Sequence, residues 1–205
     1  MHSKTFLVTG AAKRIGACIA KTLHQQGARV ILHCNHSVDL ARQLADELNA
    51  VRQRSASVIQ GDLSVQEKIN DTANQAIDAF GQVDGLINNA STFYPKAIGD
   101  YSVEDWQSLV GSNMQGPFFL TQALLEQLKL NQGVVVNIID IHSQTPLTNH
   151  TLYCMAKAGL AMMTKSLAKD LAPAVRVNGV APGAILWPEN SMDEIEKQQI
   201  MQQIP

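Results

Sequence analysis

Short apolar runs rich in β-branched residues alternate along the chain with longer segments whose apolar positions recur every three or four residues. This alternation is typical of repeated strand–helix units, which build a parallel sheet covered by helices on both faces. The predicted strands are residues 5–9, 28–33, 55–60, 84–88, 133–139 and 175–180. The predicted helices are residues 14–26, 38–49, 65–80, 103–130 and 152–171. We therefore predict a doubly wound α/β fold with right-handed crossovers.

One domain is expected for the whole chain. No linker, internal repeat or low-complexity segment divides the 205 residues, a length that suits a single core. The character of the sequence changes after Pro182, where Gly183, Pro188 and Asn190 indicate a loop and residues 191–203 a polar helix. We expect residues 183–205 to form a substrate loop and helix.

Charge and cysteine content narrow the possible partners. The 16 basic and 18 acidic residues give a net charge of -2, which argues against a general electrostatic nucleic-acid binder. No apolar run in the sequence is long enough to span a bilayer. The three cysteines, Cys18, Cys34 and Cys154, lack metal-ligand spacing and suit a reducing compartment. A cytoplasmic protein without nucleic-acid partner, membrane partner or metal site is expected.

The end of the first predicted strand has the features of a phosphate site. In parallel α/β sheets, ligands bind beyond the carboxyl ends of the strands. Gly10 follows the strand and Gly16 begins the next helix, whose unpaired N–H groups favour anions. Arg14 replaces the middle glycine of the usual dinucleotide fingerprint, and its guanidinium can bind a phosphate bidentately. An ordinary strand-to-helix turn is the alternative.

The end of the second predicted strand favours NADPH over NADH. A carboxylate there usually binds the ribose 2′-hydroxyl of NAD. Asn35, His36 and Ser37 occupy this position instead, and the first acidic residue is Asp39. Four residues offer donors that suit a 2′-phosphate: Lys13, Arg14, His36 and Ser37. A solvated loop with incidental histidines is the alternative.

A third group of residues indicates proton transfer. Tyr153 and Lys157 are four residues apart, so they lie on one face of a helix. A nearby ammonium is expected to lower the tyrosine pKa from about 10. Asp140 ends an apolar strand, where a carboxylate either caps the following turn or takes part in the chemistry.

These motifs, in this order along the chain, resemble those of the short-chain dehydrogenase/reductase family. The matching motifs are Thr9-Gly10 to Gly16, Asp62, Asn88-Asn89-Ala90, Asn113, Tyr153-Cys154-Met155-Ala156-Lys157, Arg176-Val177-Asn178 and Pro182-Gly183. The resemblance implies a Rossmann-type fold, a nicotinamide cofactor, Tyr153 as catalytic acid and Lys157 at the nicotinamide ribose. It also implies that Asn113 holds a proton-relay water and that Asp62 lies at the adenine. The implied cofactor site comprises Gly10, Lys13, Arg14, Ile15, Gly16, Asn35, His36, Ser37, Asp62, Leu63, Asn89, Ala90, Ser91, Tyr153, Lys157, Pro182 and Gly183.

Two departures from the general family pattern resemble its pteridine reductase branch. Asp140 stands thirteen residues before Tyr153, where most members have a serine, and Arg14 replaces a glycine. Ser143 lies too close to Tyr153 to take the serine's place. The stretch from Asn88 to Pro95 resembles the same branch. The implied substrate site comprises Arg14, Ser91, Phe93, Asp140 and Tyr153, with Phe93 stacking on a pterin.

The predicted activity is NADPH-dependent reduction of a C=N bond in a dihydropterin or dihydrofolate, with Tyr153, Lys157 and Asp140 handling the proton. One alternative is a ketone or 3-oxoacyl thioester reductase of the same family. Another is a catalytically silent NADPH-binding sensor. The resemblance further implies a homotetramer formed through helices 103–130 and 152–171. It also implies that a further helix and strand, which family members have after this point, are missing from the chain.

Overall fold

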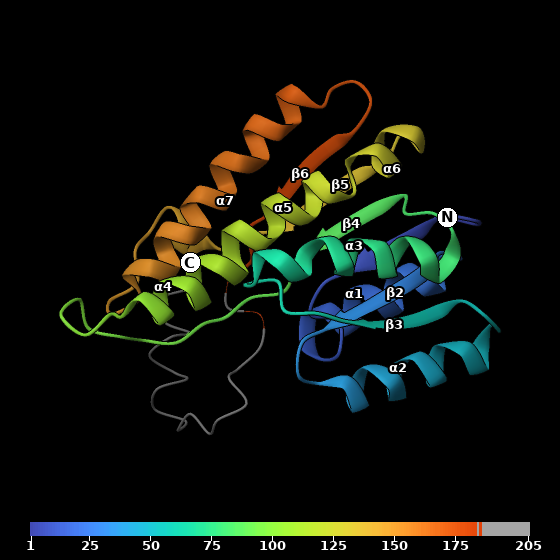
Figure 1. The fold of residues 1–205 in the computed structure, drawn as a ribbon, viewed down its shortest axis with the longest axis horizontal. Coiled ribbons are helices and arrows are strands. Elements are labelled where there is room, and N and C mark those ends of the chain that lie inside the picture. The colour runs from blue at the N-terminus through green and yellow to red at the C-terminus, as the bar shows by residue number, and fades with distance from the viewer. Residues whose placement is uncertain (184, 186–205) are drawn as a thin grey trace.

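The six predicted strands form one parallel sheet in a computed structural model that describes residues 1–183 and 185 (Figure 1). The strands are β1 (Thr5–Val8), β2 (Arg29–Cys34), β3 (Ala56–Gln60), β4 (Gly85–Asn88), β5 (Val134–Ile138) and β6 (Arg176–Val180). Their order is β3-β2-β1-β4-β5-β6, so the strand order reverses between β1 and β4. In this doubly wound fold, the reversal places a ligand crevice at the carboxyl ends of β1 and β4.

The alternation of side chains along each strand divides the core into two layers. In β1, Leu7 belongs to one apolar cluster, whereas Phe6 and Val8 belong to the other. Helices α1 (Arg14–Gln25) and α2 (Val38–Val51) cover the face of Phe6 and Val8. Helix α3 (Gln66–Phe80) covers the opposite face, together with Leu120, Leu124 and Leu128 later in the chain. The Rossmann-type fold predicted from the sequence, with helices on both faces, is therefore confirmed.

The single helix predicted over residues 103–130 is wrong. The segment is divided into α4 (Val103–Val110), a π-helical turn η1 (Gly111–Gln115), α5 (Gly116–Ala123) and α6 (Leu125–Leu130). A Cβ atom on Gly116 would lie 2.6 Å from the Leu63 carbonyl oxygen, and one on Gly111 would lie 2.9 Å from the Ser64 Cβ. The break therefore lets this segment pack directly on the loop after β3.

Helix α7 (Thr151–Asp170) runs beside β6 at one end of the sheet, and α2 lies beside β3 at the other (Figure 1). A short 3₁₀ turn, η2 (Ile141–Ser143), follows β5. The helix predicted over residues 191–203 lies outside the described residues, as do Pro188 and Asn190. No helix in the described part of the chain is long and apolar enough to cross a bilayer.

Candidate active site

A cleft of about 630 Å³ opens at the carboxyl ends of the first four strands. It brings together most of the predicted cofactor residues: Gly10, Lys13, Arg14, Ile15, Gly16, Asn35, His36, Ser37, Asp62, Leu63, Asn89, Ala90 and Ser91. It also includes residues that were not among the predicted cofactor residues: Ala12, His33, Cys34, Ser64, Thr92, Ser108 and Ser112. Tyr153, Lys157, Pro182 and Gly183 do not line this cleft. Tyr153 and Lys157 lie on α7, and Pro182 and Gly183 follow β6. All four are therefore on the β5–β6 side of the sheet.

The turn after β1 requires glycine at two positions. Gly10 has a φ of +61°, and a Cβ atom there would lie 2.9 Å from the Ala90 Cα. A Cβ on Gly16 would lie 2.2 Å from the Gly10 carbonyl oxygen. These close approaches bring the start of α1 against the ends of β1 and β4.

Arg14 occupies a backbone conformation that favours glycine. Its φ is 53°, in the left-handed region. For a residue with a side chain this conformation costs about 1–2 kcal/mol. The sequence therefore keeps an arginine at a position where glycine would be less strained, and such strain concentrates at functional sites.

His33, on β2, links the loop after β1 to the loop after β3 at the lining of the cleft, a role that sequence reasoning missed. Its Nδ1 accepts a hydrogen bond from the Gly10 N–H at 3.3 Å, so its Nε2 carries the proton and donates to the Gly61 carbonyl oxygen at 3.0 Å. The side chain is 2% exposed. Burial lowers the pKa of His33 to about 4, which keeps the ring neutral and preserves this donor–acceptor pattern. The only sequence signal was a histidine at the end of an apolar run.

Hydrogen bonds of Asn89 connect the end of β4 to the end of β1. Its Nδ2 donates to the carbonyl oxygens of Thr9 and Gly10, at 2.8 and 3.1 Å. The Thr9 hydroxyl oxygen accepts hydrogen bonds from the backbone N–H groups of Asn89 and Ala90, both at 2.9 Å. The two strand ends that form the crevice are therefore held in fixed register.

Tyr153 and Asp140 form a direct hydrogen bond. The Tyr153 hydroxyl donates to Asp140 Oδ2 at 2.6 Å, and the backbone N–H of His142 donates to Asp140 Oδ1 at 2.8 Å. One oxygen of Asp140 therefore caps η2, as the sequence allowed, and the other binds the Tyr153 hydroxyl. Tyr153 is 4% exposed, whereas Asp140 is only partly buried.

The expectation that Lys157 lowers the pKa of Tyr153 is wrong for this structure. Burial, and then the Asp140 carboxylate, raise the pKa of Tyr153 above its ordinary value. Lys157 Nζ lies 5.7 Å from the Tyr153 ring centroid and donates instead to the Ile138 carbonyl oxygen at 2.9 Å. Burial lowers the pKa of Lys157 to about 8, against the opposing effect of Asp140.

The Asn113 amide connects the π-helical turn to the loop after β4. Its Nδ2 donates to the carbonyl oxygens of Thr92 and Leu109, at 2.8 and 2.9 Å. Its Oδ1 accepts a hydrogen bond from the Ser91 hydroxyl at 2.7 Å. Both ends of the amide therefore bind protein groups, and the residue holds the loop that leads to Phe93.

The Phe93 ring lies between the predicted proton donor and solvent. It stacks on His150, with ring centroids 4.5 Å apart and planes 17° apart. It also meets Tyr153 edge to face, with centroids 4.8 Å apart. Phe93 is 55% exposed, so it is not the core aromatic that its type alone would suggest. A flat ligand can reach this ring from solvent next to Tyr153.

Among the described residues, no group of three or more His, Cys, Asp and Glu side chains could hold a metal ion.

Comparisons with known proteins identify the family of the chain. The sequence profile of the short chain dehydrogenase family matches residues 4–199. The chain is 36% identical over 223 aligned residues to "Pteridine reductase 1" of Leishmania tarentolae, covering 90% of this chain and 77% of that protein. It is 34% identical over 190 residues to "Uncharacterized oxidoreductase SERP2049" of Staphylococcus epidermidis (92% and 80% covered). It is also 33% identical over 208 residues to "Uncharacterized oxidoreductase YmfI" of Bacillus subtilis (99% and 84% covered). The chain therefore belongs to the short-chain dehydrogenase/reductase family of oxidoreductases, whose members use NAD(H) or NADP(H).

Proposed function

We propose that the protein is an NADPH-dependent reductase that reduces a C=N bond of a dihydropterin or dihydrofolate. The observation that carries the proposal is the 2.6 Å hydrogen bond between Tyr153 and Asp140, beside the exposed ring of Phe93. Similarity to a protein named pteridine reductase supports the substrate class. Arg14 and Asp140, the two departures from the general family pattern, belong to this proposal.

The cleft fits a dinucleotide phosphate. Gly10 and Gly16 let the backbone approach closely at the start of α1, whose N–H groups favour anions. Lys13, Arg14, His36 and Ser37 line the same cleft from the loops after β1 and β2, and residues 33–38 contain no carboxylate. These groups suit the 2′-phosphate of NADPH better than the 2′-hydroxyl of NADH. Bound there, NADPH would supply the hydride that reduces the C=N carbon.

The chain's own residues supply the proton. The Tyr153 hydroxyl is protonated at neutral pH and would donate its proton to the nitrogen of the reduced bond, while burial and Asp140 raise its pKa and make it a weaker acid than a free phenol. A water held by Asp140 is the second possible donor. Lys157 Nζ lies 5.7 Å from the Tyr153 ring centroid, and it would contact the nicotinamide ribose, as the resemblance to the family implies. A carboxylate suits this relay because a C=N nitrogen is more basic than a ketone oxygen.

Phe93, Ser91 and Arg14 would bind the substrate. A pterin ring stacked on Phe93 would lie next to the Tyr153 hydroxyl, since the two side chains are in contact. Ser91 and Arg14 line the adjoining cleft, where the Ser91 hydroxyl oxygen would accept a hydrogen bond from the polar edge of the ring and the Arg14 guanidinium would donate one. We further propose that residues 1–205 form one domain, that residues 183–205 contribute a substrate loop, and that the enzyme is a cytoplasmic homotetramer.

A parallel activity assay tests the proposal. NADPH oxidation is followed by absorbance with dihydrobiopterin, dihydrofolate or a 3-oxoacyl thioester as substrate, and repeated with NADH. The proposal predicts turnover of the pterin or folate, with a preference for NADPH. Turnover of the thioester alone would make the protein a carbonyl reductase. Cofactor binding without turnover of any substrate would favour a sensor.

A further inference from the structure

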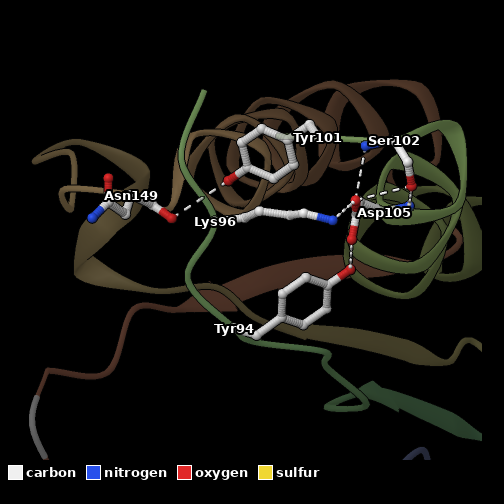
Figure 2. Close-up of polar contacts among 6 residues, drawn as sticks. All are labelled: Tyr94, Lys96, Tyr101, Ser102, Asp105 and Asn149. Atoms are coloured by element: carbon white, nitrogen blue, oxygen red, sulfur yellow. Dashed lines mark hydrogen bonds and ion pairs between the residues drawn. The ribbon is translucent and has the colours of Figure 1, made fainter. Parts of the chain in front are cut away.

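The carboxylate of Asp105 binds several residues of one loop through hydrogen bonds and an ion pair. Residues 89–102, which we call the β4–α4 loop, lead from β4 to Ser102, the N-cap of α4. Asp105 Oδ2 accepts hydrogen bonds from the Ser102 backbone N–H at 2.8 Å and from its hydroxyl at 3.0 Å. The Tyr94 hydroxyl donates to Asp105 Oδ1 at 2.9 Å, and the Lys96 ammonium forms an ion pair with Oδ2 (Figure 2). A helix cap alone needs only the Ser102 contacts.

The same loop is hydrogen-bonded to Asn149, two residues before α7. The Lys96 backbone N–H donates to the Asn149 carbonyl oxygen at 2.6 Å. The Tyr101 hydroxyl donates to that oxygen at 3.5 Å. Figure 2 shows the Lys96 side chain extending to Asp105, while the Asn149 carbonyl faces Tyr101 on the opposite side of the loop. Asn149 has a φ of 60°, a left-handed conformation that fixes the direction in which the chain enters α7.

Phe93 and His150, whose rings stack, are each next in sequence to a residue that holds the loop in place. Phe93 precedes Tyr94, and His150 follows Asn149. The two rings are stacked at 4.5 Å although they lie on different segments, so their contact depends on how the β4–α4 loop is held against α4 and the start of α7. The Asp105 side chain is 12% exposed and that of Lys96 is 32% exposed, so solvent screens this ion pair only in part.

We propose that Asp105 is a positioning residue for substrate binding: through Tyr94 and Lys96 it holds the β4–α4 loop so that Phe93 stays stacked on His150 and faces Tyr153. This inference rests on the proposed function, because it assigns to Asp105 the alignment of the ring that would bind the pterin. Asp105 does not line the cleft and contacts no reacting atom in this role.

The charge state of Asp105 agrees with this role. The Lys96 ammonium, and then the Ser102 N–H, hold the pKa of the Asp105 carboxyl well below its ordinary value. The carboxylate therefore remains ionised, and the tie to Lys96 persists, at every pH at which the enzyme would be assayed.

Three variants separate positioning from capping. Asp105→Asn keeps an oxygen that can accept from Ser102, but it removes the ion pair with Lys96. Lys96→Met removes the same ion pair and leaves the helix cap intact, so it serves if the first variant folds poorly. Glu126→Gln is the matched control, since it breaks an exposed ion pair with Lys129 on α6.

The expected result is a change in KM without a matching change in kcat. If the loop is correctly held in only one tenth of the variant molecules, the KM for dihydropterin rises about tenfold. The Kd for NADPH and the KM of Glu126→Gln should stay at wild-type values. In the double variant Lys96→Met, Asp105→Asn the KM should rise no further than in either single variant, because both remove one interaction. An additive rise, or an unchanged KM in both single variants, would overturn the inference.

Hydrogen–deuterium exchange of residues 91–102 provides a readout that needs no substrate. We expect faster exchange of this segment in Asp105→Asn and Lys96→Met, and wild-type exchange in Glu126→Gln. Faster exchange confined to α4 would mean that Asp105 is only a cap. If the wild-type enzyme reduces no pterin, the proposed function fails, while the exchange experiment still decides whether Asp105 holds the loop.

Discussion

Replacement of His33 by glutamine should remove part of the pH dependence of folding. His33 is buried and binds Gly10 and Gly61 in its neutral form. Its pKa is lowered from 6.5 to about 4. The folded protein therefore takes up this proton at a lower pH than the unfolded chain does. The stabilisation is complete above the unfolded pKa and is lost as the pH falls from there through the folded pKa.

The magnitude follows from the size of the pKa difference. A gap of about 2.5 units corresponds to about 3 kcal/mol once the pH is below both pKa values. Between pH 7 and pH 5 the loss is about 2 kcal/mol. Wild-type protein should therefore lose about 2 kcal/mol more of its free energy of unfolding over this interval than His33→Gln loses.

Denaturant titration at the two pH values measures this difference. The glutamine side chain keeps a donor and an acceptor but does not titrate, so the remaining ionisable groups affect both proteins alike. His24, whose pKa is also lowered, is present in both and cancels from the comparison. Equal losses of stability in the two proteins would refute the account of His33 as a neutral bridge between loops.

Three other substitutions test the site. Tyr153→Phe should lower kcat by about 10²–10⁴-fold and leave the Kd for NADPH unchanged; wild-type turnover would reject Tyr153 as the proton donor. Asp140→Ser should impair pterin reduction selectively in the parallel assay, and full pterin turnover would remove Asp140 from the relay. Arg14→Gly should weaken NADPH binding in a fluorescence titration, because it removes a guanidinium from the proposed phosphate site. Unchanged NADPH affinity would contradict this interpretation of Arg14.

The fold could be predicted from the sequence because each strand is a short apolar run bounded by polar or glycine residues. The periodicity did not reveal the break in the helix predicted over residues 103–130. Its apolar positions continue across Gly111 and Gly116, but both glycines lie against the loop after β3, where no side chain fits. That contact joins segments distant in the sequence, so no local pattern could report it.

In the candidate site too, some residues could be predicted from the sequence and others could not. Tyr153 and Asp140 were expected from their motif positions, and the structure brings them into direct contact. His33 and Asp105 were missed because their partners lie on other loops, 23 and 28 residues away for His33 and up to 11 residues away for Asp105. The direction of the Tyr153 pKa shift was also wrong, since burial outweighs a lysine that binds a backbone carbonyl.

Isotope transfer from labelled cofactor tests the central claim most directly. NADPH carrying deuterium at both hydrogens of nicotinamide C4 is incubated with dihydrobiopterin and the enzyme, and the product is analysed by mass spectrometry. Tyr153→Phe serves as the matched blank. The account predicts a tetrahydropterin that carries a single deuterium on carbon. A tetrahydropterin without deuterium, or no tetrahydropterin while a 3-oxoacyl thioester is reduced with the label, would contradict it.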